Sequence, residues 1–383
     1  MITLEADVGA TGRLRSVDVF RGATMVAMIL VNNPGDPATA YWPLQHARWH
    51  GWTPTDLVFP FFLFIVGVAI VLALKRRADA GAPVGPLHLK IVRRSAILFG
   101  LGLFLSGFPF GLFGARSFGE LLEVWRIPGV LQRIAVCYLA VSLLVLHCRV
   151  RTLRVLTVVA LVGYWAVMTL VPVPGQGAPD IDDPAGHLSG WLDRAVFGDH
   201  VWEQAAVYDP EGLLSTIPAL ATTLFGVFAG LLLGARVEPV ERAARLLVAG
   251  SALVACGYVW GWFFPINKPI WTSSYAVFTA GLAFCALALC YWLVDIRGER
   301  TISGLLVIYG VNAIAVYVGS GVLARTLAVV EVNGVPVKRL IYDALFASWL
   351  PPHAASLAYA VAWVAGWFLV LAVMYRRRVF IKI

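Results

Sequence analysis

Apolar stretches long enough to cross a bilayer as helices recur along this chain, and they constrain its fold more than any other feature. A bilayer core requires roughly 20 apolar residues per helix. Ten stretches approach that length, near residues 17–33, 54–74, 91–113, 127–148, 152–173, 212–235, 243–264, 271–294, 302–326 and 353–375. Of the 383 residues, 60% are hydrophobic and 14% are charged. We predict an all-α integral membrane protein, a polytopic bundle of about ten transmembrane helices, rather than a soluble domain or a β-barrel.

The distribution of positive charge predicts the orientation. Of the 30 Lys and Arg residues, 20 lie in the two terminal tails and in four connections between predicted spans. With ten spans these segments all face one side, so the positive-inside rule predicts cytoplasmic N- and C-termini. The polar residues before Ser16 lack the pattern of a cleavable signal, so we expect the first span to be retained. The net charge of +8 fits a lipid bilayer partner and no nucleic acid, because the basic residues flank spans.

The connections on the opposite side carry most of the loop-forming sequence. The longest, 174–211, begins with Gly, Pro and Asp residues that predict turns, and an amphipathic helix is expected at Leu188–Phe197. We expect this loop to help bind a substrate. The five Cys residues are single and without metal spacing, which indicates neither a disulfide framework nor a metal site. No segment has the composition of a linker, so we predict a single transmembrane domain over residues 1–383.

A polar segment after the first predicted span is the main candidate for chemistry. Asn32 ends that span, His46 lies in the following loop, and Asp56 falls in the first turn of the next span. Thr53-Pro54 is typical of a helix start, so Asp56 could be an acid at the positive end of the helix dipole. Alternatively, Asp56 holds a neighbouring His in one tautomer, as a base or acyl acceptor requires. A merely solvated His46 is the plainer interpretation.

Two arginines near the start of the fourth span are candidates for binding an anion. Arg126 precedes the span, and Arg133 lies roughly 10 Å into it at 1.5 Å per residue. A guanidinium at that depth needs a partner. The partner is either an acid, Asp56 or Glu123, or a bound phosphate or carboxylate.

Polar groups within the first and ninth spans have two interpretations as well. Asp18 and Arg21 lie three residues apart on one helix face, where they either anchor the helix end as an ion pair or contact an anionic cofactor. Asn312 follows a helix-packing Gly in the ninth span and either forms an interhelical hydrogen bond or contributes to the same cofactor site.

Polar residues of the opposite face are candidates for binding an acceptor. Tyr208, Asp209 and Glu211 precede the sixth span, where the acids either cap the helix or form a patch for an amine or sugar hydroxyls. Asn267 and Lys268 lie in a loop on the same predicted face. The chain has fourteen Trp residues, many of them near predicted span boundaries. The first interpretation is an aromatic belt at the membrane interface, and the second is stacking on a sugar.

Taken in order, these residues resemble the transmembrane acetyltransferases typified by heparan-alpha-glucosaminide N-acetyltransferase and its bacterial relatives. The elements that carry the resemblance are Arg13 through Gly22, Val31-Asn32, His46-Ala47 with Trp49 and Gly51, Asp56 through Pro60, Arg126 through Arg133, Tyr208 through Gly212, Asn267-Lys268, and Ile381-Lys382-Ile383.

The resemblance implies transfer of an acetyl group from cytoplasmic acetyl-CoA to the amino group of a terminal glucosamine on the far side of the membrane. The catalytic His of the family's first exoplasmic loop corresponds to His46, and the Asn that ends its first span corresponds to Asn32. We infer that Asp56 orients the His46 ring. His46 either becomes acetylated or removes a proton from the amine. We expect acetyl-CoA to bind at Arg133, Arg126, Asp18, Arg21 and Asn312, the acceptor to bind at Tyr208, Asp209, Glu211, Asn267 and Lys268, and no metal to be used.

Two departures from the family affect what can be carried over. We expect no counterpart of the family's long luminal N-terminal region and additional first span, and Ser320 stands where the lysosomal enzyme has a His. The compact chain resembles bacterial members, so we expect a bacterial inner-membrane location and an envelope or scavenged amino sugar as acceptor.

Alternative functions are O-acylation of an envelope glycan, and a transporter or export protein whose polar cluster is a permeation site. A transporter is expected to have internal repeats or matching broken spans. Family members look dimeric, and the Gly faces of the sixth span (Gly226, Gly230, Gly234) and ninth span (Gly304, Gly310, Gly319) would permit a homodimer or intramolecular packing equally.

Overall fold

The computed structural model describes residues 14–112 and 117–381, so Arg13, Lys382 and Ile383 of the predicted motifs lie outside the described residues. These residues form two compact units. The first unit comprises the chain up to Gln45, Arg236–Ala249 and the chain from Ala283, and the second comprises His46–Ala235 and Gly250–Leu282. Helices α10 (Pro239–Trp260) and α11 (Ser273–Tyr291) contribute residues to both units.

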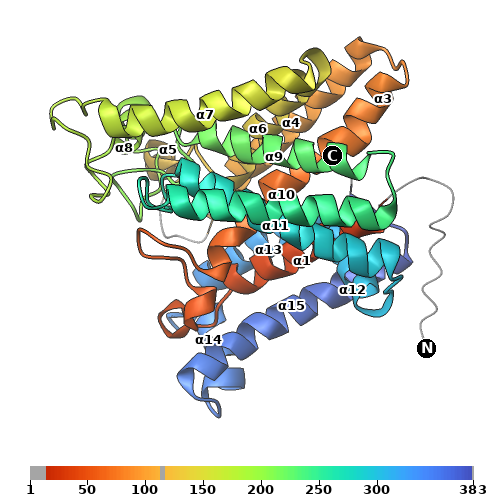
Figure 1. Ribbon diagram of the computed structural model, residues 1–383. Helices are drawn as coiled ribbons and strands as arrows, with labels where there is room; N and C mark the ends of the chain where they lie inside the picture. Colours follow the sequence, from red (N-terminus) through yellow and green to blue (C-terminus); the bar gives the residue numbers. More distant parts are fainter. Residues whose placement is uncertain (1–13, 113–116, 382–383) are drawn as a thin grey trace. The chain divides into compact units, whose positions relative to one another are not determined.

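Helices dominate the second unit, and the expected helix at Leu188–Phe197 is confirmed. Its elements are η3 (Pro54–Leu57), α2 (Val58–Ala69), η4 (Ile70–Lys75), α3 (Arg76–Asp79), α4 (Val84–Gly107), α5 (Phe118–Val124), α6 (Val130–His147), α7 (Val150–Leu170), α8 (Leu188–Phe197) and α9 (Thr216–Leu233). Helix α7 packs along α9 (Figure 1).

The first unit is helical apart from a short hairpin. Its elements are α1 (Arg15–Asn32), η1 (Pro37–Thr39), η2 (Trp42–Leu44), η5 (Trp292–Ile296), α12 (Thr301–Val311), α13 (Ala313–Val329), β1 (Glu331–Val332), β2 (Val335–Pro336), α14 (Val337–Tyr342), η6 (Asp343–Ala347) and α15 (Pro352–Arg376). Asn333 and Gly334 join the two strands with positive φ values of 53° and 76°. An Asn-Gly pair is the preferred sequence for such a two-residue hairpin turn.

Each of the ten predicted stretches contains helix among its described residues, and the apolar helices make this a multi-pass membrane protein. Within the part of the chain that the structure describes, seven helices are long and apolar enough to cross a membrane, and the bent pair α12–α13 would be an eighth. Helices α1 and α4 have 18 and 24 residues. Each carries charged side chains inside its apolar sequence, Asp18 and Arg21 in α1 and Lys90, Arg93 and Arg94 in α4.

The ninth predicted span is not one straight helix, which corrects the expectation for 302–326. Helices α12 and α13 meet at an angle of 71°, and Asn312 between them has a non-helical φ of −120°. The Asn312 amide donates to Val379 O at 3.2 Å and accepts from Ile381 N at 3.0 Å. Asn312 therefore binds the backbone of the C-terminal tail at the break in the helix.

Glycines allow the closest helix contacts within each unit. A Cβ on Gly226 of α9 would lie 1.9 Å from Phe64 O of α2, and a Cβ on Gly67 of α2 would lie 2.0 Å from Thr223 O. In the first unit, a Cβ on Gly310 of α12 would lie 2.2 Å from Asp18 O of α1. Small residues stabilise membrane helix pairs by letting backbones approach, so these glycines serve intramolecular packing.

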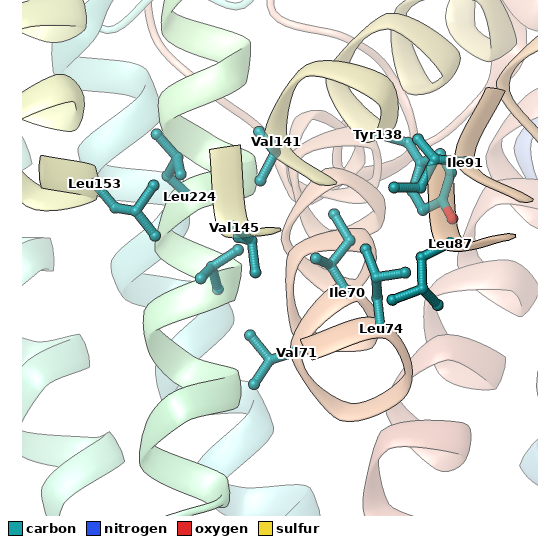
Figure 2. Packing of buried hydrophobic residues seen from close by; sticks show 11 residues of the cluster. Ile70, Val71, Leu74, Leu87, Ile91, Tyr138, Val141, Val145, Leu153 and Leu224 are labelled. Carbon is teal, nitrogen blue, oxygen red and sulfur yellow. The ribbon is translucent and has the colours of Figure 1, made fainter. Parts of the chain in front are cut away.

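Large apolar side chains fill the other contacts of the second unit. Figure 2 shows one buried cluster, to which η4, α4, α6, α7 and α9 all contribute. Its members are Ile70, Val71, Leu74, Leu87, Ile91, Tyr138, Val141, Val145, Leu153, Leu224 and Val227. The cluster joins α6, which carries Arg133, to η4, which continues α2.

Substitution of Gly226 by Ala tests the α2–α9 contact. We expect the folded state to lose about 1–3 kcal/mol of stability, because the added methyl group meets a backbone oxygen that cannot rotate away. Thermal unfolding of the detergent-purified protein measures the loss. Gly234→Ala is the matched control, because no atom lies nearer than 3.5 Å to its added Cβ. Equal unfolding temperatures for the two variants would contradict this packing.

Candidate active site

The Asp56 carboxylate organises the start of η3 and the loop before it. Its Oδ2 atom accepts hydrogen bonds from Thr53 N at 3.0 Å, the Thr53 hydroxyl at 3.1 Å and Ala47 N at 3.0 Å. Asp56 is 1% exposed, and its backbone O accepts from the Tyr275 hydroxyl at 2.6 Å. Asp56 therefore caps the helix start as expected. It also binds the backbone of Ala47, the residue after His46.

The other Asp56 oxygen faces the His46 ring. Oδ1 lies 2.6 Å from His46 Nδ1. An ionised carboxylate can only accept, so the proton of a neutral His46 ring is on Nδ1 and the lone pair is on Nε2. The His46 side chain is 53% exposed. A substrate can therefore reach a ring whose tautomer suits Nε2 for accepting a proton or an acyl group.

Lys268 lies against the same pair. Its Nζ is 2.9 Å from His46 Nδ1, 3.3 Å from His46 Nε2 and 3.5 Å from Asp56 Oδ1. Burial lowers the pKa of the Lys268 amine, and the charges of Asp56 and Glu211 oppose that change. The prediction places Lys268 at the acceptor, and sequence spacing carries no signal that it lies beside a residue 222 positions earlier.

The loop that carries Lys268 is anchored to the His46 loop. Asn267 is fully buried, and its side chain accepts from Ile270 N and lies 3.2 Å from His50 Nδ1. Gly51 N also donates to Ile266 O at 2.7 Å. These contacts fix the loop backbone on both sides of Lys268.

Arg126 and the two acids before α9 form one ion cluster. Arg126 donates to both Asp209 oxygens at 2.6 and 2.8 Å and to Glu211 Oε2 at 2.5 Å. Burial lowers the pKa of Arg126, but the charges of Glu211 and Asp209 outweigh it and raise the pKa above its usual range. The Asp209 side chain is fully buried and also accepts from Trp202 N. Asp209 is thus a partner of Arg126 within the protein.

Arg133 is buried without an acidic partner among the described contacts. Its Nη2 donates to Gly212 O at 2.9 Å and to the Ser215 hydroxyl at 2.5 Å, and its Cζ lies 5.3 Å from the Trp271 ring centroid. The residue is 2% exposed, and Nε and Nη1 have no hydrogen-bond partner in the described part of the chain. Neither salt bridge considered above, to Asp56 or Glu123, is present among these contacts.

Aromatic side chains connect the His46 loop to the long loop 174–211. Trp49 stacks on His187 with ring centroids 5.8 Å apart and meets the edge of Tyr208 at 5.3 Å. Trp49 Nε1 donates to Ile181 O at 2.9 Å. The half-buried Tyr208 therefore lies in an aromatic group beside the loop that carries His46.

Helix α8 holds the backbone that precedes α9. Asp193 accepts from Leu213 N at 2.9 Å and from Asp209 N at 3.3 Å. Burial raises the pKa of Asp193 to about 6. The ionised form of the buried Asp193 carboxylate therefore lowers the stability of the folded protein. Its hydrogen bonds to Asp209 N and Leu213 N hold the segment that presents Asp209 and Glu211 to Arg126.

The remaining predicted site residues lie in the first unit. Asp18 and Arg21 form an ion pair at 2.5 Å, and Arg21 Nε donates to Gly310 O at 2.6 Å near the end of α12. Asn312 binds the C-terminal tail, as described above. Asn32 is the exposed last residue of α1. The first three side chains thus have structural partners, and their assignment to a cofactor site stays a prediction, as does the role of Asn32.

Comparison with known proteins supports the sequence resemblance. The family model described as "Heparan-alpha-glucosaminide N-acetyltransferase, catalytic" matches residues 13–178. Heparan-alpha-glucosaminide N-acetyltransferase of Homo sapiens is 32% identical over 97% of this chain, and that of Mus musculus is 31% identical over 98%. This chain is similar to the heparan-alpha-glucosaminide N-acetyltransferases over nearly its whole length. It spans 60% and 61% of the lengths of these curated relatives.

The region matched by the family model contains His46, Asp56, Arg126 and Arg133. All four lie in the second unit, which also contains Tyr208, Asp209, Glu211, Asn267 and Lys268. The sequence analysis missed Tyr275, His187 and Asp193, which support this region. Their signal was weak, since a Tyr inside an apolar span and polar residues on a short helix have many ordinary uses.

His187 gives the structure a pH dependence that can be measured. Its Nδ1 accepts from Gly190 N at the start of α8, and burial lowers its pKa from 6.5 to about 4. Between these values the folded protein binds fewer protons than the unfolded chain. The stability contributed by His187 is therefore fully present above pH 6.5 and is lost as the pH falls through 4, by at most about 3 kcal/mol.

His187→Asn should reduce this acid destabilisation, because Asn can accept from Gly190 N and does not titrate. Thermal unfolding as a function of pH should show a smaller decrease for the variant than for wild type. Asp193 contributes with the opposite sign in both proteins, so the difference between them isolates His187. Identical pH dependences would show that His187 is accessible to protons in the folded state.

Proposed function

We propose that this protein transfers an acetyl group from acetyl-CoA to the amino group of a glucosamine-type sugar, with His46 as the catalytic residue. The observation that carries this proposal is the His46–Asp56 pair, in which a buried carboxylate sets the tautomer of an exposed ring. The similarity to N-acetyltransferases over nearly the whole chain supports the choice of reaction.

The reaction needs one group that can accept a proton or the acetyl group. The carbonyl carbon forms a bond to the sugar nitrogen, the thioester C–S bond breaks, and CoA leaves as the thiol. His46 Nε2 either takes the proton released by the amine or carries the acetyl group between two such steps. Asp56 stabilises the positive ring that either route produces, because its Oδ1 accepts from Nδ1.

Arg133 is our candidate for binding the anionic part of acetyl-CoA. It has two buried donors without a partner, and buried donors of a cation are costly to leave unpaired. A phosphate or carboxylate oxygen would satisfy them. Arg126 is already bound by two acids, so we assign it a supporting part, in which it positions Glu211 and the backbone near Tyr208.

We further propose ten spans in a bacterial inner membrane, with both termini in the cytoplasm. The basic flanks support this orientation, and with it His46 lies on the periplasmic side while acetyl-CoA is supplied from the cytoplasm. The acetyl group or its carrier must then pass through the helix bundle. An amino sugar of the envelope is the acceptor class that fits this sidedness.

A transport function has one observation in its favour. Broken spans mark binding sites in many transporters, and the α12–α13 pair is bent by 71°. The break is occupied by backbone of the C-terminal tail, which accounts for Asn312 without a transported substrate. Uptake or export of amino sugar without CoA release, in proteoliposomes, would favour transport over acyl transfer.

His46→Ala tests the catalytic assignment. The detergent-purified variant should release CoA from acetyl-CoA about 10²–10⁴-fold more slowly than wild type in the presence of glucosamine, since a positioned acid–base group contributes about that much. Glucose as acceptor distinguishes N-acylation from O-acylation. His353→Ala is a control, because that exposed ring lies in the first unit. Equal rates for wild type and His46→Ala would contradict the assignment.

Asp56→Asn tests the tautomer. Asn can present an amide donor to Nδ1, which favours the ring proton on Nε2 and removes the acceptor that catalysis needs. We expect a loss of at least about 10²-fold in kcat with acetyl-CoA binding retained. Isothermal titration with acetyl-CoA checks binding separately. A variant with normal kcat would show that Asp56 acts only at the helix start.

A further inference from the structure

Three charged or titratable side chains meet at one ring nitrogen in the candidate site. His46 Nδ1 lies 2.6 Å from Asp56 Oδ1 and 2.9 Å from Lys268 Nζ. The first neighbour can only accept a hydrogen bond and the charged form of the second can only donate. Nδ1 cannot satisfy both at once, so the contact with Lys268 needs an explanation beyond hydrogen bonding.

Asp56 alone would favour a positively charged His46. An opposite charge this close stabilises the protonated ring, and a ring that is already protonated can accept neither a proton nor an acetyl group. A nearby cation, which disfavours the protonated ring, would therefore help to keep His46 neutral before the substrates react. Lys268 is the cation found there, 3.3 Å from Nε2 and 3.5 Å from Asp56 Oδ1.

We propose that Lys268 is a positioning residue whose positive charge keeps the resting His46 ring neutral while leaving its tautomer to Asp56. This inference rests on the proposed function, and it changes the part that we assigned to Lys268 from acceptor binding to control of the catalytic base. The shorter contact of Nδ1 is with Asp56, so the proton remains on Nδ1 and Lys268 pairs with the carboxylate beside it.

The position of Lys268 is built into the fold. Asn267 holds the turn by accepting from Ile270 N, and Trp271 N donates to Lys268 O at 3.0 Å. The Lys268 side chain is only 18% exposed. A lysine that merely contacted a soluble substrate would not need a fully buried Asn beside it and a closed turn around it.

Few other charges act on the ring. Oδ2 of Asp56 is occupied by Thr53 and Ala47, so Oδ1 is the oxygen that acts on His46. Glu211 acts on Lys268 electrostatically and opposes the effect of burial on the lysine's pKa. His50, on the far side of Asn267, pairs with Asp182. Lys268 is thus the cation within hydrogen-bond distance of the ring among these described contacts.

The test measures protonation of His46 without requiring catalysis. Diethylpyrocarbonate modifies neutral imidazole, and peptide mass spectrometry reports the extent at His46 as a function of pH. In the detergent-purified full chain, Lys268→Met should move the half-modification pH of His46 upward by about one unit, because a neighbouring like charge has been removed. Lys268→Arg should match wild type, and the exposed His353 should be unchanged in all three proteins.

Two results would overturn the proposal. An unchanged His46 profile in Lys268→Met would show that its charge does not act on the ring. An equal shift of the half-modification pH in Lys268→Arg and Lys268→Met would show that the change of side-chain size, and not the loss of charge, is responsible. If Lys268→Met does not fold, Lys268→Gln replaces it with the same expected shift.

The acyl-transfer assay distinguishes this inference from the proposed function. If wild type transfers acetyl groups, the acid side of its pH–rate profile should shift upward in Lys268→Met by the amount seen at His46. If wild type transfers none, the proposed reaction fails, while the modification profile still decides whether Lys268 controls the ring.

Discussion

The buried carboxylate of Asp56 is the interaction on which the rest of the site depends. Its two oxygens serve different purposes, one binding the backbone and hydroxyl that begin η3 and the other facing His46. Tyr275 holds the Asp56 backbone from α11. The position of the His46 ring is therefore fixed by the same contacts that start the α2 span, and the candidate chemistry is coupled to the folding of the second unit.

Charge compensation extends outward from this carboxylate. Lys268 lies against the His46–Asp56 pair, Arg126 is paired with Asp209 and Glu211, and Asp193 accepts from the backbone N of Asp209. Arg133 is the exception, since its contacts are a carbonyl, a hydroxyl and an aromatic ring. A buried cation of this kind is the natural place for an anionic substrate group to complete the charge balance.

The sequence was most informative where a local rule operates. Apolar length predicted where long helices lie, and Thr53-Pro54 before Asp56 predicted the helix start, because both depend on neighbouring residues. The bend at Asn312 was missed, since its cause is a contact with Val379 and Ile381, more than 60 residues away. Lys268 beside His46 was missed for the same reason. Long-range juxtapositions leave no periodic signal in a single sequence.

A structure with a bisubstrate analogue would test the central claim most directly. The analogue joins the glucosamine nitrogen to CoA through the two-carbon acetyl unit, and electron cryomicroscopy would locate it in the purified protein. Our account predicts the sugar nitrogen within about 3 Å of His46 Nε2, the geometry of direct proton transfer, with an anionic group of CoA against Arg133. An analogue bound with its sugar nitrogen away from His46 would contradict the account.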